Sequence, residues 1–200
     1  MMFPVIGVVI ESVAAFIPKV IEIVGANLLQ FANILSGIFK GLELISPDEE
    51  IIDLGDKALQ AEEQGIKPEN YDTYSEYLDA IRLFEVDADK SAIIDETKKI
   101  EKGAEVITAT LVENYGDVAI DLIRLIAKNP PYFEERIPYF TEMQKTDPKT
   151  FSDITRYIEG KETDIDKADE TLGRIYDVEK KIDENTSLQD MMAEIEKLQD

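Results

Sequence analysis

The residues of this sequence that could do chemistry are carboxylates, because the chain contains 43 acidic residues, no histidine and no cysteine. The commonest general base, the commonest transition-metal ligand and the thiol nucleophile are therefore missing. Paired carboxylates can cleave glycosides when an apolar pocket raises the pKa of one of them. Glu134, Glu135, Glu142 and the run from Asp164 to Glu170 fall among polar neighbours instead, so we interpret them as solvated helix faces.

A second acidic segment, from Asp87 to Asp95, places side-chain oxygens at positions one, three, five and nine, as at the start of an EF-hand calcium loop. That loop also needs a glycine at position six and a bidentate glutamate at position twelve. This sequence has Ala92 and Lys98 there. We therefore predict no metal site, and interpret these aspartates and Ser91 as caps of the following helix.

Glycine-rich signatures are also missing, since the segment from Gly37 to Gly41 is neither a phosphate-binding loop nor a dinucleotide fingerprint. We predict no catalytic residues and no cofactor, and we expect a protein that is not an enzyme.

Charge is distributed unevenly along the chain. Residues 1–46 contain three acidic and two basic residues, a formal charge of −1, whereas the whole chain carries −22. So acidic a protein is repelled by phosphate backbones, and no basic stripe reverses the sign locally, so we expect no direct nucleic-acid partner. The apolar start from Met1 to Ile10 lacks the basic segment and the cleavage site of a signal peptide. We therefore expect a location in the cytoplasm, in a particle or at a membrane surface.

The elements that position these residues are predicted to be helices. Between Pro4 and Ile45, apolar residues recur at intervals of three and four with one extra four-residue step, which is the spacing of a helical heptad with a stutter. Pro18 is expected to kink this helix and Gly25 to divide it, so that a long helix and a helical hairpin are both consistent with the pattern.

Beyond residue 46 the sequence becomes acidic and predicts a multi-helix bundle. We expect Ser46 to cap a helix near 48–64, with Thr73 or Asp72 capping one over 72–84, and Ser187 capping the last one. A single long helix is predicted from Ser91 to Lys128, and shorter helices near 132–145, 148–159 and 163–181. The fold class is therefore all-α, with an apolar helical arm over residues 1–46 and an acidic helical body over residues 47–200.

The arm is the predicted interaction element. A narrow line of small and polar residues, among them Asn33, Gly37 and Gly41, would let another helix backbone approach closely. The predicted interface consists of this line and the apolar stripe beside it: Val13, Ile17, Val20, Val24, Leu28, Phe31, Asn33, Leu35, Gly37, Ile38, Gly41 and Leu42.

Three surroundings of the arm are consistent with its sequence: the chain's own bundle, other protein subunits, or lipid. The uncharged run from Ile23 to Phe39 is 17 residues long, at the lower limit for crossing a bilayer, which takes ~17–25 residues. The leading hypothesis is a non-enzymatic structural or assembly protein, of the kind found in virion, secretion or injection machines, that forms a homo-oligomer or docks a helical protein partner. The alternatives are a membrane-active helical protein, such as a pore former, and a helical adaptor.

Overall fold

The computed structural model describes residues 6–199, and all regular secondary structure in this range is helical. The all-α class predicted from the sequence is thereby confirmed. The elements are α1 (Ile6–Val24), η1 (Gly25–Asn27), α2 (Leu28–Gly41), α3 (Ile51–Glu63), η2 (Pro68–Asn70), α4 (Tyr74–Arg82), α5 (Ala88–Ile93), α6 (Glu96–Tyr115), α7 (Val118–Lys128), α8 (Pro130–Thr146), α9 (Thr150–Ile158), α10 (Ile165–Ile182) and α11 (Leu188–Gln199).

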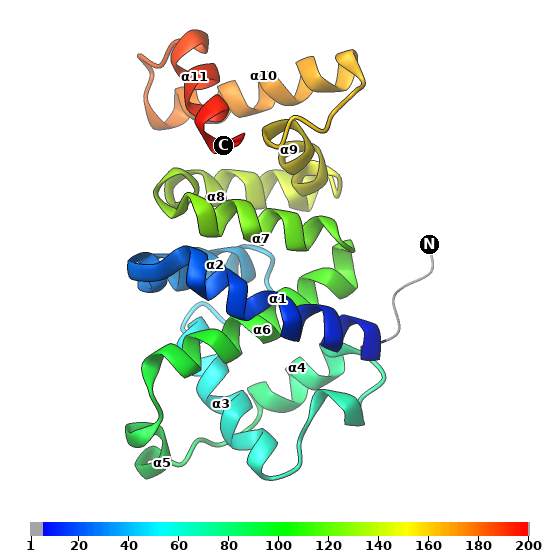
Figure 1. Cartoon of the computed structure of the whole chain (residues 1–200), viewed down its shortest axis with the longest axis vertical. Coiled ribbons are helices and arrows are strands. Elements are labelled where there is room, and N and C mark those ends of the chain that lie inside the picture. Colours follow the sequence, from blue (N-terminus) through cyan, green and yellow to red (C-terminus); the bar gives the residue numbers. More distant parts are fainter. Residues whose placement is uncertain (1–5, 200) are drawn as a thin grey trace.

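The apolar N-terminal segment forms two helices in succession. Pro18 lies inside α1, and the 3₁₀ turn η1 separates α1 from α2 where the sequence predicted a division. Gly25 has φ 52°, a left-handed backbone conformation that glycine adopts without steric cost. The two helices then run in clearly different directions (Figure 1). The apolar start from Met1 to Ile10, which we predict is not a signal peptide, lies in part outside the described residues, because these begin at residue 6.

The prediction of one long helix from Ser91 to Lys128 is wrong, because the helix is interrupted twice and the segment forms the end of α5, then α6 and α7. Ile94 is extended, and Asp95 begins the new helix α6 by accepting a hydrogen bond from the backbone N–H of Thr97 (2.9 Å). Gly116, with φ 73°, then ends α6. The apolar periodicity continues across the second break, which explains why the pattern alone indicated a single helix.

The predicted helix start at Ser46 is also corrected. The helix α3 begins only at Ile51, where Glu50 and Asp53 form a reciprocal capping box. Ser46 instead donates its backbone N–H to the carboxylate of Glu49 in the preceding turn (3.1 Å). The caps predicted at Thr73 and Ser187 are confirmed, since each hydroxyl accepts a backbone N–H of the next turn.

The helix α6 forms the centre of one half of the molecule. It packs against α1, α2, α3, α4 and α7, and Figure 1 shows α1 crossing in front of it. Its middle section is buried on several sides rather than on one stripe, as expected for a central helix: Ile100, Gly103, Ala104, Val106, Ile107, Thr108, Ala109, Thr110, Leu111 and Val112.

The contact between α3 and α6 is the closest in the fold. A Cβ atom on Gly55 would collide with the backbone carbonyl of Lys99, and one on Gly103 would collide with the carbonyl of Ile51. Each helix thus contributes a glycine that accommodates the backbone of the other. Only glycine permits two helix backbones to approach this closely.

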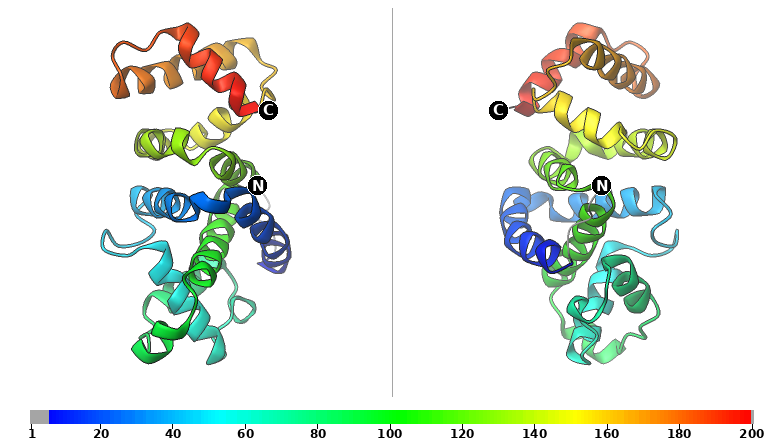
Figure 2. Two further views of the ribbon diagram at one scale, coloured as in Figure 1. Left: turned by 60° about the vertical axis from the view of Figure 1, so that its left-hand side comes forward. Right: turned by 90° about the vertical axis from the view of Figure 1, so that its right-hand side faces the viewer.

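The second half of the molecule stacks above α1 and α2 in successive layers, with α7 and α8 next and α9, α10 and α11 at the far end (Figures 1 and 2). A buried ion pair ties α8 to α10. Arg136 donates to both carboxylate oxygens of Glu179 at 2.5 and 2.6 Å, and their side chains are 8% and 3% exposed. Two parallel bonds of this kind fix orientation as well as distance.

We expect Gly55→Ala or Gly103→Ala to destabilise the protein by about 1–3 kcal/mol or more, because the added methyl group meets backbone atoms that cannot rotate away. Chemical denaturation followed by circular dichroism measures this change. Gly173→Ala is the matched control: Gly173 lies in α10 and a Cβ there has no atom within 4 Å. That substitution should stabilise the protein by several tenths of a kcal/mol through helix propensity. Equal effects at the three glycines would contradict the close crossing.

Candidate interaction surface

The apolar stripe of the predicted interface lies against the protein's own helices. The residues of the whole predicted interface, from the stripe and from the line of small residues together, fall into three groups by burial. Val13, Ile17, Val20, Val24, Phe31, Leu35 and Ile38 are buried, Leu28, Gly41 and Leu42 are half-buried, and Asn33 and Gly37 are exposed. The covering helices are α6 and α7 over α1, and α8 and α6 over α2. Whether these residues also contact another chain stays a prediction, and so does the division into an arm and a body at residue 46. The geometry favours an N-terminal segment that belongs to this chain's own core.

The line of small residues on α2 lies against α8, most closely at Gly41. A Cβ on Gly41 would collide with the side chain of Thr141, whereas one on Gly37 would lie 3.9 Å from the nearest atom, in Ile137. At Gly41, α2 is therefore in close contact with the Thr141 side chain of α8, a helix of the same chain, whereas the close approach of another helix backbone along this line stays a prediction.

We accordingly expect Gly41→Leu to lower the free energy of unfolding by about 1–3 kcal/mol through overpacking. Gly37→Leu should stay within about 0.5 kcal/mol or be slightly stabilising, since exposed helix positions tolerate leucine. Thermal unfolding of the two variants beside the wild type checks this, and equal loss at both positions would show that the whole line is tightly packed.

The acidic segment that resembles a calcium loop serves as two helix caps. Asp87 accepts the backbone N–H groups of Asp89 and Lys90 at the start of α5, and Asp95 caps α6. Within residues 6–199, no group of three or more acidic side chains is arranged to hold a metal ion.

A buried charge cluster that sequence reasoning missed joins α3, α5 and α6. The Asp56 carboxylate forms an ion pair with Lys99 (2.8 Å), and it accepts hydrogen bonds from the Ser91 hydroxyl and from the Gln60 amide (2.9 Å). Lys99 also donates to the Ser91 hydroxyl at 2.9 Å. Its members lie far apart in the sequence, so no local pattern reveals it.

The hydrogen bonds of this cluster indicate that it holds the three helices together and does not act as a catalytic site. A serine nucleophile is activated by a general base that takes its proton, but the carboxylate that accepts from Ser91 is that of Asp56, which is paired with Lys99 and whose lowered pKa makes it a weak base. Burial disfavours the charged carboxylate, yet the hydrogen bonds from its partners outweigh burial and keep the pKa of Asp56 below its ordinary value of 3.8.

Because that pKa is lowered on folding, Asp56 contributes stability above about pH 4, and this contribution is lost as the pH falls through the folded pKa. We expect Asp56→Asn to cost about 3 kcal/mol or more at pH 7, because it leaves the ammonium of Lys99 buried without its partner. The cost should shrink as the pH falls below about 4 and the carboxylate of Asp56 becomes protonated. Asp79→Asn is the control, since that side chain is 78% exposed. A cost of Asp56→Asn that does not vary with pH would contradict the role of its charge.

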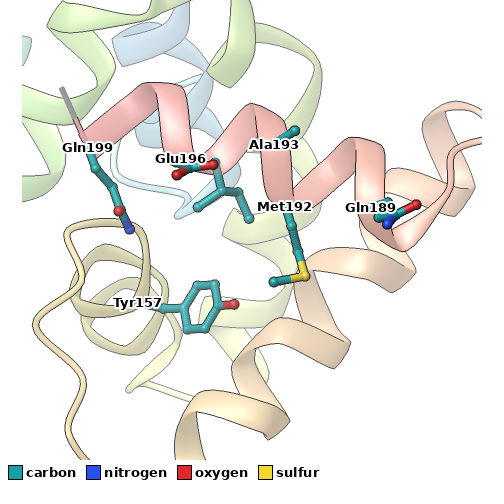
Figure 3. Close-up of a pocket in the computed structure, with 7 residues that line it drawn as sticks. Tyr157, Gln189, Met192, Ala193, Glu196 and Gln199 are labelled. Carbon is teal, nitrogen blue, oxygen red and sulfur yellow. The ribbon is translucent and has the colours of Figure 1, made fainter.

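A hollow of about 470 Å³ lies between α9 and α11. Figure 3 shows Met192 and Tyr157 facing each other across it, with the amides of Gln189 and Gln199 towards its two ends. Glu196 is the one charged group among its lining residues. The side chains do not converge on a common point, so the hollow has the character of an open helix junction rather than of a ligand site.

The outward face of α1 is the most distinctive surface of the protein. Every fourth residue along it is exposed, and these residues form a row that we call the α1 ridge: Gly7, Glu11, Ala15, Lys19 and Ile23. Val8 beside it is 60% exposed and Ile23 is 47% exposed. Other large apolar side chains are also strongly exposed, such as Leu83, which directly follows α4, and Ile93 at the end of α5, and single exposed residues of this kind are ordinary for a protein surface.

A shallow groove runs between this ridge and α7. Its walls are Ser12, Ala15, Phe16, Lys19 and Ile23 from α1, and Ile120 and Arg124 from α7. Its charged members are both cations, although the protein as a whole is strongly acidic. Arg124 lies over the Phe16 ring (5.6 Å to the centroid) and pairs with Asp121 (2.6 Å).

No helix among the described residues is long and apolar enough to span a bilayer. Comparison with known protein families, curated proteins and solved structures found no match for this chain. The chemistry of its own surface is therefore the basis for a functional proposal.

Proposed function

We propose that this protein is a non-enzymatic assembly protein that self-associates through the outward face of α1. The observation that carries the proposal is the α1 ridge with its groove: an exposed row in which small and apolar residues accompany one acid and one base, so that the row has no net formal charge on a chain of −22. Exposed apolar side chains with few charges around them are typical of protein contacts.

Electrostatics support the same surface. Two copies of a chain with charge −22 repel each other over most approaches, and the screening length is about 8 Å at physiological ionic strength. The segment that holds α1 and α2 carries only −1 within residues 1–46. Contact through this segment therefore adds little repulsion.

The test is the mass of the full chain, measured by sedimentation over a wide concentration range at physiological and at raised salt. We expect the mass to rise above the monomer value of 22.6 kDa. Ala15→Glu should abolish the rise, because it places a charge in the middle of the contact. Ala14→Glu is the matched control, since Ala14 is an exposed alanine of the same helix that lies off the ridge.

Both variants should keep the wild-type circular dichroism, because exposed helix positions usually tolerate such changes within about 0.5 kcal/mol. A wild-type mass that stays at the monomer value under all conditions would sink the proposal. Leakage of lipid vesicles by the monomeric chain would favour the membrane-active alternative instead.

A further inference from the structure

The α1 ridge is complementary in charge and size to a second copy of itself that runs in the opposite direction. Its residues follow one another at intervals of four: Gly7, Glu11, Ala15, Lys19 and Ile23. About Ala15 as midpoint, the acid Glu11 corresponds to the base Lys19, and the smallest residue, Gly7, corresponds to the large Ile23. We propose that two copies of the chain pack their α1 ridges antiparallel about a two-fold axis at Ala15, and this inference rests on the proposed function.

The geometry of such a pair follows from how helices pack. Rows of residues four apart form ridges along a helix, and two helices cross closely where the residue at the crossing point is small. Ala15 at the axis has a small side chain and allows the two helices to approach. At either side of the axis, Glu11 of one copy then lies next to Lys19 of the other, so the contact contains two equivalent ion pairs.

These two charges have no ion-pair partner among the residues that the structure describes. Glu11 and Lys19 are both exposed, and neither forms an ion pair within residues 6–199. They are two helical turns apart, about 12 Å along the axis, which is too far for a direct pair in the same helix. Lys19 has a cationic neighbour across the groove in Arg124, so a carboxylate from outside is favoured there.

A two-fold contact uses the same surface on both partners and is closed, so it stops at two copies. A contact of the ridge with a different surface would instead leave one ridge free and continue into a filament or a ring. The antiparallel arrangement therefore predicts a mass that levels off at twice the monomer value.

Charge reversal tests the arrangement. Glu11→Lys alone gives a ridge with two bases, and Lys19→Glu alone gives a ridge with two acids. Each single variant should associate roughly tenfold or more weakly than the wild type, because two attractive contacts become repulsive. An equimolar mixture of the two single variants should form a mixed pair about as tightly as the wild type, since each base then faces an acid.

The double variant Glu11→Lys with Lys19→Glu is the control for net charge, because it keeps −22 and restores opposite charges across the axis. It should pair with itself as the wild type does. Sedimentation of the full chains, with one single variant fluorescently labelled, measures all these masses, and circular dichroism verifies that each variant folds.

Association that is lost at Ala15→Glu but not rescued in the mixture would overturn the antiparallel pair and leave self-association through α1 intact. Association of each single variant as tight as that of the wild type would do the same. A wild-type chain that never associates would overturn both proposals.

Discussion

The close crossing of α3 and α6 is the constraint on which the rest of the structure depends. Gly55 and Gly103 remove the two Cβ atoms that would hold the helices apart, so that backbone meets backbone. With α3 and α4 packed so closely on α6, the remaining surface of α6 is covered by α1, α2 and α7. A helix that is apolar on several sides needs such covering on each of them.

This requirement determines which face of α1 is left to solvent. The buried stripe of α1, from Val9 to Val24, faces the core and cannot at the same time bind another chain without opening the fold. The opposite face is nevertheless rich in small and apolar residues, among them Val8, Ala15 and Ile23. It also carries the acid Glu11 and the base Lys19, whose charges cancel. The proposed self-association rests on this combination of small, apolar and oppositely charged residues.

Much of the fold could be predicted from sequence because its signals are local. Apolar periodicity indicated the helices, and the hydroxyls of Thr73 and Ser187 cap helices as expected. The break at Gly116 was missed, since one left-handed residue interrupts a helix without disturbing its apolar pattern. The cluster around Asp56 was missed because its partners come from helices that meet only in the folded chain.

The candidate surface shows the same limit of local signals. An apolar stripe such as that of Val13 and Ile17 indicates that something covers the helix, but it does not say whether the cover is the same chain or another. The fold resolves this ambiguity for the inner face by placing α6 and α7 against it.

The outer face is then distinguished by electrostatics rather than by apolar area alone. Apolar residues such as Leu83 and Ile165 are more exposed than Val8 and Ile23 of α1, but they lie in the part of the chain that holds most of its acidic residues. Bringing two copies together at those points would bring like charges within a screening length over a wide area. Along α1 the acid Glu11 and the base Lys19 alternate on one row. Repulsion is smallest where charges are few and balanced, and the balanced charges of the α1 ridge are therefore the reason why we propose it, rather than another exposed apolar site, as the contact between copies.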